Sequence, residues 1–146
     1  MEECQICQKH HGDGPLKGIL VGRTPHFWVW HGPPRPDGKT RLGYVVIESD
    51  RHAPYIADLT QKEAAELGKL RVALAAAIRE ALQPEFVFSA VIGMGVEHFH
   101  EHVFARPHRE PKDVPWDDSD SLLDGVEAAG LEPLAQRLRV AIQDIQ

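Results

Sequence analysis

The feature that most restricts the fold is one long helical repeat in the middle of the chain. Apolar residues recur three or four positions apart from Leu67 onward, and the pattern stops at Pro84, which indicates an amphipathic helix of roughly six turns. Thr60 and Glu63 have the spacing of a capping box, so the helix is expected to begin there. A helix of this length with one apolar stripe needs a sheet face to cover.

Short runs of branched and aromatic residues on both sides of the helix are typical of strands. Five such runs are present, at residues 18–22, 27–30, 43–48, 86–92 and 96–105. The first two are separated by Arg23-Thr24-Pro25, which predicts an antiparallel hairpin. Residues 131–142 repeat at helical spacing and predict a C-terminal helix. The expected fold class is therefore α+β, with a mainly antiparallel sheet of about five strands and the long helix on one face.

Length and composition exclude several classes of protein. A chain of 146 residues with 42% hydrophobic and 26% charged residues predicts a single domain over residues 1–146. The net charge of -6 argues against a nucleic-acid polymer as the partner and favours a small-molecule ligand. The longest apolar run is far shorter than the ~20 residues of a membrane-spanning helix. The acidic N-terminus lacks the features of a secretory signal, so we expect a cytoplasmic protein without membrane contact.

Three histidines, His98, His100 and His102, alternate in the predicted strand over residues 96–105. On a strand their side chains would project from one face, with successive residues ~6.5 to 7 Å apart. Imidazole exchanges protons near neutral pH and is a good nucleophile and metal ligand. The spacing alone leaves three interpretations open: a catalytic row, a metal site, or polar residues that face solvent.

The two cysteines, Cys4 and Cys7, form a Cys-x-x-Cys pair at the N-terminus. In a reducing compartment such a pair indicates a metal site or a redox pair more than a structural disulfide. A structural zinc ion takes four ligands, so two thiolates need two histidines in addition. The local alternative is His10 with His11, although adjacent residues of an extended segment point apart. The remote alternative brings two histidines from elsewhere in the chain.

The triad, followed by Val103 and Phe104, resembles the signature of the histidine triad (HIT) family. The resemblance covers about residues 1–107. The strand over residues 43–48, the loop that ends in His52 and the long helix follow in that family's order. Residues 108–146 would be a C-terminal extension of the HIT-like domain.

The Cys-x-x-Cys pair is similar to that of the zinc-containing bacterial branch of the family and of the related hexose-1-phosphate uridylyltransferases. In the zinc-containing relatives the positions of His52 and His98 complete the site. The resemblance thus implies structural zinc as the cofactor, held by Cys4, Cys7, His52 and His98. In branches without zinc, the positions of His52 and His98 belong to the catalytic network. Relatives also form two-fold dimers, which implies a homodimer.

The resemblance further implies the chemistry of the remaining two histidines. His100 would attack the α-phosphorus of a nucleotide and form a covalent nucleotidyl-histidine. His102 would contact the scissile phosphate and help protonate the leaving group. Transferase relatives carry glutamine at the position of His102, so the histidine favours hydrolysis.

Several positions depart from the family pattern. His31 stands nearest to the aspartate that usually contacts the ribose, and we expect it near the ligand. Val87 replaces a common asparagine, and Gly95 replaces the serine or threonine that commonly contacts phosphate. The backbone amides of Gly93 and Gly95 are expected to bind phosphate in its place. Glu101 replaces an apolar residue.

The expected activity is hydrolysis of nucleoside phosphate anhydrides, esters or phosphoramidates, with diadenosine polyphosphates among the candidate substrates. One alternative is a nucleotidyltransferase, which would pass the nucleotide from His100 to a phosphate acceptor. The other is a regulatory module that binds nucleotide or zinc with weak catalysis, an alternative raised by His31, Val87 and Gly95. Product analysis distinguishes the first alternative, and binding without turnover would favour the second.

Overall fold

A computed structural model describes residues 3–32, 35–108, 110–115, 126 and 128–146. Parts of the predicted C-terminal extension, residues 109, 116–125 and 127, lie outside this description. The helices and strands in chain order are α1 Gln5–His10, β1 Ile19–Arg23, β2 Phe27–His31, β3 Tyr44–Ser49, the 3-10 helix Ile56–Asp58, α2 Gln61–Leu82, β4 Phe86–Ala90, β5 His100–Arg106 and α3 Ala128–Ile142.

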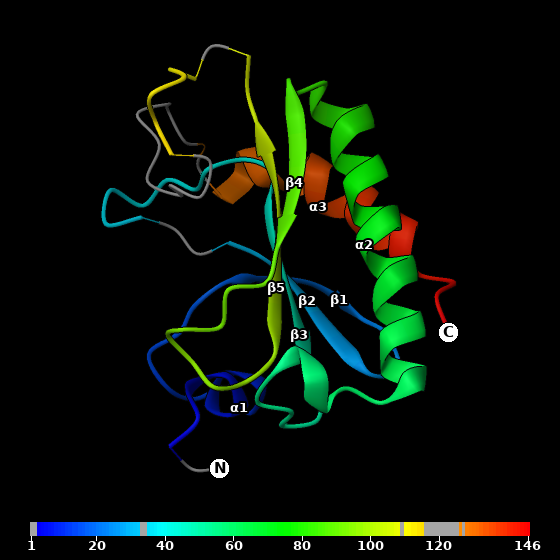
Figure 1. The fold of residues 1–146 in the computed structure, drawn as a ribbon. Coiled ribbons are helices and arrows are strands. Elements are labelled where there is room, and N and C mark those ends of the chain that lie inside the picture. Colours follow the sequence, from blue (N-terminus) through cyan, green and yellow to red (C-terminus); the bar gives the residue numbers. More distant parts are fainter. Residues whose placement is uncertain (1–2, 33–34, 109, 116–125, 127) are drawn as a thin grey trace.

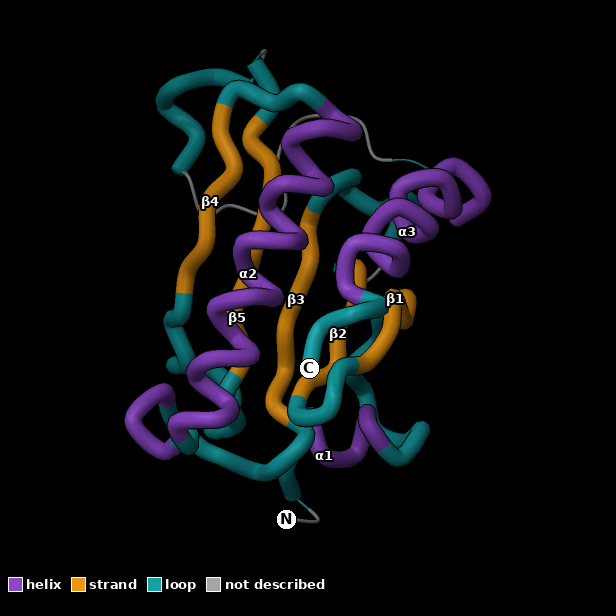
Figure 2. Tube along the Cα trace, turned by 90° about the vertical axis from the view of Figure 1, so that its right-hand side faces the viewer, coloured by secondary structure: helices purple, strands orange, loops and turns teal. Residues whose placement is uncertain are grey.

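The five strands form one sheet in the order β1-β2-β3-β5-β4, and every neighbouring pair is antiparallel. Helices α2 and α3 lie on one side of this sheet, whereas α1 and the long loops lie on the other (Figure 1). Seen from the helix side, α2 runs along the strands and α3 lies beside it over β1 and β2 (Figure 2). This arrangement is the HIT-like α+β fold predicted from the sequence, with its five strands, its hairpin and both helices.

The core lies between the sheet and the two helices. Helix α2 buries Leu70, Leu74 and Ile78, and α3 adds Leu134 and Leu138 to the same core. The predicted capping box is confirmed: the Thr60 hydroxyl accepts a hydrogen bond from Glu63 N at 3.1 Å, and the Glu63 carboxylate accepts one from Thr60 N at 2.9 Å. Two backbone N–H groups at the start of the helix, which have no partner within it, thereby gain one, and α2 starts at a fixed residue.

Two local features differ from the sequence prediction. Strand β5 begins at His100 and not at residue 96, because Phe99 N donates to Ala53 O and Phe99 O accepts from Ser49 N. The chain before His100 is thus bonded to the loop after β3, and His98 precedes the strand. Helix α1 was not predicted. Cys4 caps it, since the Cys4 Sγ accepts a hydrogen bond from Cys7 N.

No helix among the described residues is long and apolar enough to cross a membrane.

Candidate functional site

Two of the three triad histidines lie side by side on the sheet face opposite α2. His100 and His102 alternate in phase on β5, and their ring centroids are 5.2 Å apart. Their cross-strand neighbours on β3 are Glu48, opposite His100, and Val46, opposite His102. Because directly opposed residues of an antiparallel pair project to the same side, Glu48 shares this surface. We call it the histidine face.

The His100 imidazole is held in one tautomer by the backbone. Its Nδ1 lies 2.7 Å from the carbonyl oxygen of His98. A carbonyl oxygen can only accept, so Nδ1 carries a proton, and the neutral form of the ring has its lone pair on Nε2. The ring is only partly buried, which leaves Nε2 able to reach a ligand. The backbone contact therefore selects the tautomer in which Nε2 can act as a nucleophile.

His102 is hydrogen-bonded to a tyrosine on the neighbouring strand. The Tyr44 hydroxyl lies 2.8 Å from His102 Nδ1. Burial, and secondly the charge of His100, lower the pKa of His102 to about 4, so the ring is neutral at pH 7. When the Tyr44 hydroxyl donates to Nδ1, the ring proton resides on Nε2 and can be donated to a ligand. The sequence did not single out Tyr44, because its contact depends on the register between β3 and β5.

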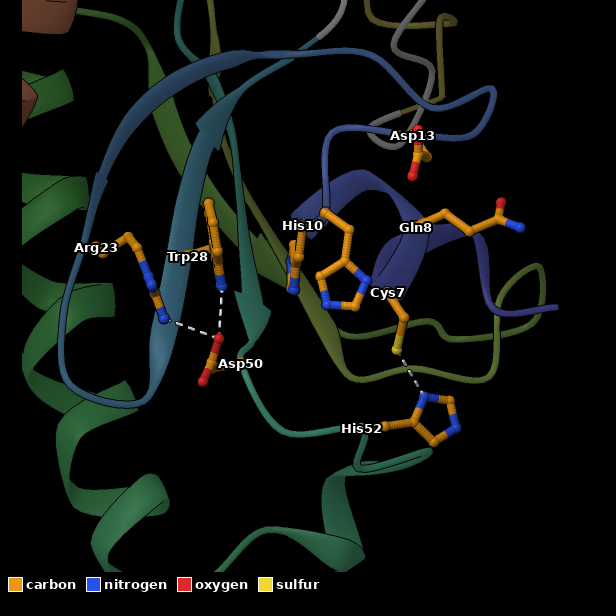
Figure 3. A pocket seen from close by; sticks show the side chains of 9 residues that line it. Cys7, Gln8, His10, Asp13, Arg23, Trp28, Asp50 and His52 are labelled. Carbon is orange, nitrogen blue, oxygen red and sulfur yellow. Dashed lines mark hydrogen bonds and ion pairs between the residues drawn. The ribbon is translucent and has the colours of Figure 1, made fainter. Parts of the chain in front are cut away.

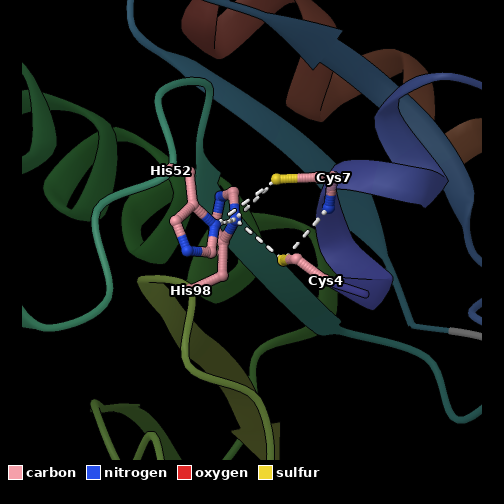
Figure 4. A group of neighbouring side chains, drawn as sticks. All are labelled: Cys4, Cys7, His52 and His98. Carbon is pink, nitrogen blue, oxygen red and sulfur yellow. Dashed lines mark hydrogen bonds between the residues drawn. The ribbon is translucent and has the colours of Figure 1, made fainter. Parts of the chain in front are cut away.

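The third triad histidine belongs to a separate cluster of Cys4, Cys7, His52 and His98, whose ligand atoms all lie within 4.8 Å of one another (Figure 4). The His98 Nδ1 lies 3.4 Å from the Cys4 Sγ and 3.5 Å from the Cys7 Sγ. The His52 Nδ1 lies 3.4 Å from the Cys7 Sγ and 3.2 Å from the His98 Nδ1. A tetrahedral zinc ion with bonds of ~2.0 to 2.3 Å requires ligand separations of about 3.3 to 3.8 Å. The donor set and its spacing therefore fit zinc.

Local structure explains how this cluster forms. Cys4 and Cys7 are three residues apart at the start of α1, so the first helical turn brings both sulfurs to one side. The His98 Nε2 donates to Ser49 O at 2.7 Å, which leaves Nδ1 unprotonated toward the sulfurs. Burial, and then the neighbouring Cys4, raise the pKa of the Cys7 thiol to about 11, so a thiolate there needs a cation beside it.

Of the two alternatives for completing the metal site, the structure assembles the remote one. His52 and His98 reach the sulfurs, whereas His10 pairs with Glu48 and stacks on Trp28, with ring centroids 4.6 Å apart. His11 is exposed.

Figure 3 shows an open pocket beside this cluster, lined by residues of α1, β2 and the loop after β3. Trp28 lies at its side, and the Trp28 Nε1 donates to Asp50 at 2.7 Å. Arg23 also pairs with Asp50, at 2.8 Å, and its guanidinium lies over the Trp28 ring. The pocket thus adjoins both the metal cluster and the aromatic side chains of β2.

A buried carboxylate on the histidine face was missed by the sequence analysis. Glu48 is 1% exposed and accepts hydrogen bonds from Lys9 and His10 of α1, at 2.5 and 3.3 Å. Burial alone would raise the pKa of Glu48, but the contacts with His10 and Lys9 outweigh it and hold the pKa below its usual value. A strand pattern could have placed Glu48 on the face of Val46, but not beside His100.

His31 is not brought to the histidine face, contrary to its expected place near the ligand. It shares the phase of Phe27 and Val29 on β2, so its ring points to the core side and is fully buried. Its Nε2 accepts from Gly43 N at 3.0 Å. Burial lowers the pKa of His31 to about 4. This imidazole supports the turn into β3.

Gly93 and Gly95 lie in the loop between β4 and β5, as predicted. Gly93 has a φ of +69°, a conformation that favours glycine. Gly95 lines a pocket together with Cys4, His52 and Glu97, on the metal-cluster side. The proposed contact of these glycines with phosphate stays a prediction.

The departure at Glu101 has a structural explanation. Glu101 points away from the histidine face and is fully buried between the sheet and α2. Arg71 of α2 donates to both of its carboxylate oxygens, at 2.6 and 2.7 Å, and the Ser89 hydroxyl donates at 2.7 Å. A bidentate ion pair thus replaces an apolar contact and joins β5, β4 and α2.

Solved structures of histidine triad proteins have this fold. A HIT protein from Sinorhizobium meliloti is 18% identical, with a TM-score of 0.71 over 97% of this chain and 98% of that one. A Zn-bound histidine triad family protein from Mycobacterium smegmatis is 19% identical, with a TM-score of 0.64 over 97% and 94%. A hypothetical histidine triad nucleotide-binding protein from Sulfolobus tokodaii is 18% identical, with a TM-score of 0.66 over 97% and 93%. No family model and no curated protein matches the sequence.

Proposed function

We propose that this chain is a histidine triad protein, an enzyme that hydrolyses nucleoside phosphate compounds through a nucleotidyl-histidine. The observation that carries the proposal is the orientation of His100: its Nδ1–H is bound to His98 O, and its ring lies next to that of His102. The shared fold supports it, and one protein with that fold is described as nucleotide-binding. The candidate substrates are anhydrides such as diadenosine polyphosphates, esters and phosphoramidates.

In the first step, His100 Nε2 attacks the α-phosphorus and forms a P–N bond while the bond to the leaving group breaks. The leaving oxygen or nitrogen takes a proton from His102 Nε2, and the Tyr44 hydroxyl can donate a proton to His102 Nδ1 in turn. In the second step, a water attacks the phosphorus and His100 leaves. The water's proton returns to the histidine pair, so the enzyme is regenerated. Because His102 is neutral in the free protein, it acts as a hydrogen-bond donor that becomes a better proton carrier once an anionic phosphate lies beside it.

Structural zinc is the cofactor that fits this chain, with Cys4, Cys7, His52 and His98 as its ligands. The Mycobacterium smegmatis protein with the same fold is Zn-bound, which supports this assignment. When bound, zinc would cross-link α1, the loop after β3 and the segment before β5, and it takes no part in the steps above. Zinc binding requires Cys4 and Cys7 to be reduced and without a disulfide, which favours a reducing compartment and supports a cytoplasmic location.

The homodimer implied by the resemblance has a candidate surface along β4. This strand is one edge of the sheet, and Phe86 on it and Val72 on α2 are 51% and 68% exposed. An open edge with apolar side chains beside it favours pairing with a second copy. Sedimentation of wild type and Phe86→Lys is expected to show a dimer that the variant converts to monomer.

The decisive experiment traps the covalent intermediate. Wild type, His100→Ala and His102→Gln are mixed with a substrate labelled at the α-phosphate, quenched within one turnover and analysed by intact mass. Wild type and His102→Gln are expected to carry an alkali-stable, acid-labile nucleotidyl adduct, and His100→Ala none. His108→Ala, an exposed histidine, is the matched control and should behave as wild type. An adduct in His100→Ala would reject the mechanism, and binding without any adduct would favour the regulatory module. Product analysis with added phosphate separates hydrolysis from transfer.

A further inference from the structure

The carboxylate of Glu48 lies in an unexpected place for a protein that attacks phosphorus. Glu48 is the direct cross-strand neighbour of His100 and projects from the same face, so the two side chains are adjacent. The carboxylate is 1% exposed, and its field is therefore poorly screened by water. An anionic phosphate in front of His100 Nε2 meets this negative charge unless a cation compensates it.

Lys9 is in position to be that cation. Its Nζ lies 2.5 Å from the Glu48 Oε1 and 4.4 Å from the centroid of the Trp30 ring. The side chain is only 10% exposed and comes from α1, so the ammonium is held over β2 and β3 on the histidine face. An ammonium has three N–H donors, and the Glu48 contact uses one of them. The remaining N–H groups of Lys9 can donate hydrogen bonds to phosphate oxygens.

The other charged or titratable side chains near this face already have partners, and His10 is one of them: its Nε2 lies 3.3 Å from the other Glu48 oxygen. Arg106 donates to the carbonyls of Val114 and Pro111, and Arg23 is paired with Asp50 at the far edge. The two ring nitrogens of His102 belong to a neutral imidazole, which brings no net charge to the free site.

We propose, building on the function above, that Lys9 binds the substrate phosphate and that Glu48 tunes this contact. Glu48 holds the ammonium on the histidine face in the free protein, and its charge lowers the affinity for anions. The pair thus determines specificity for phosphate charge. Removal of Lys9 leaves the Glu48 carboxylate with only its contact to His10, and removal of the Glu48 charge leaves the Lys9 ammonium without its anionic partner. The two changes therefore have opposite effects on the binding of an anionic ligand.

The test compares Lys9→Met with Glu48→Gln. Met keeps an unbranched stem against Trp30, and Gln keeps the shape of Glu48, so each variant removes mainly one charge. The dissociation constants of the four ribonucleoside 5′-monophosphates and of the corresponding neutral nucleosides are measured by calorimetry. For the best monophosphate, Lys9→Met is expected to weaken binding by about tenfold or more, as for the loss of a charged hydrogen bond, and Glu48→Gln to tighten it by about threefold or more. Neutral nucleosides should change by less than about twofold, and Lys9→Arg should retain most of the affinity.

A purely structural pair, which only anchors α1 to β3, predicts a different result. Both variants would then weaken binding in the same direction, and nucleoside and monophosphate would be affected alike. That outcome, or unchanged binding of monophosphate in Lys9→Met, overturns the proposal while leaving the hydrolase mechanism intact. Zinc content is measured in each variant, because its retention shows that α1 remains in place. Wild type that neither binds monophosphate nor forms the His100 adduct would reject the proposed function itself.

Discussion

The two faces of the sheet use polar residues in opposite ways. On the helix face, Glu101 is buried under α2, and Arg71 donates to both of its oxygens. His31 is also buried there, and its neutral ring accepts a hydrogen bond from Gly43 N. On the histidine face, His100 and His102 keep ring nitrogens for a ligand, and the buried Glu48 is paired with a lysine from a short helix. Sequence alternation places these residues on opposite faces, but what covers each face decides whether a polar side chain is enclosed within the fold or stays within reach of a ligand.

The comparison predicts that changes on the histidine face alter activity with little loss of stability, and that changes on the helix face do the reverse. The metal cluster joins α1 to the loop after β3 and to the segment before β5, so a change there should affect both stability and activity.

The largest effect is expected from Cys7→Ser, which removes a buried ligand of the metal cluster. Structural zinc contributes ~10 to 16 kcal/mol of apparent binding free energy in small zinc-dependent peptides, and a chain with a larger core should lose a fraction of this. We expect loss of zinc and a decrease of about 3 kcal/mol or more in the free energy of unfolding, or ~6 to 12 °C in Tm. Elemental analysis and calorimetry measure both, with His11→Ala as the control next to the cluster. A variant that keeps its zinc and its Tm would reject the ligand set.

His102→Gln tests the histidine face alone. Loss of the proton donor is expected to slow formation of the adduct by ~10² to 10⁴, because general acid catalysis contributes that much. The free energy of unfolding should change by less than about 1 kcal/mol. The rate should recover with a substrate whose leaving group needs no proton. A variant that is slow with every leaving group and equally destabilised would show that the two faces are not separable.

His31→Gln tests the helix face through pH. The folded pKa of about 4 lies below the ordinary value of 6.5, so the unfolded chain binds more protons between these values. The neutral buried ring therefore contributes full stability above pH 6.5, and this stability is lost as the pH falls toward 4. At pH 5 the loss amounts to about 2 kcal/mol. Glutamine can accept from Gly43 N without titrating, so the variant should lose less stability than wild type between pH 7 and 5 in urea unfolding. Parallel curves would contradict the assignment.

Glu101→Gln is expected to have the smallest effect. It removes one charge from the pair with Arg71, whose side chain is 41% exposed and can be rehydrated, so we expect a loss of about 1 to 2 kcal/mol. The matched control is Glu80→Gln, at an exposed position on α2, the helix that carries Arg71. The rate of adduct formation should stay within about threefold of wild type. A much larger loss of activity would show that the helix face orients His100.

Much of the fold was predictable because it depends on local patterns. The helical repeat and the Thr60 capping box define α2, and alternating runs define the strands within a few residues. The start of β5 was misplaced because residues 96–99 have a strand-like composition, while the hydrogen bonds of Phe99 to the loop after β3 are long-range. Helix α1 is six residues long and was missed, since its capping group is a cysteine.

The candidate site was predictable where a motif carried it. The histidine spacing and the Cys-x-x-Cys pair identified the residues of both clusters, and the resemblance supplied the pairing of His52 and His98 that spacing alone left open. Lys9, Tyr44 and Glu48 could not be found, because each depends on a contact made across strands or between α1 and β3. His31 was misassigned, since its place in the sequence near a strand end does not specify the face to which it points.

The Cys4–His98 contact spans 94 residues of the chain, which has a consequence for the kinetics of unfolding. Bringing such distant residues together costs loop-closure entropy, so in the unfolded chain only the nearby Cys4 and Cys7 can share an ion. The full ligand set exists only after β3 and β5 have paired, and the ion would close the ring late in folding. Capture of the metal by an excess of strong chelator should then be limited by the opening of this ring, and its rate would report how often β5 and the N-terminal helix separate in the native protein.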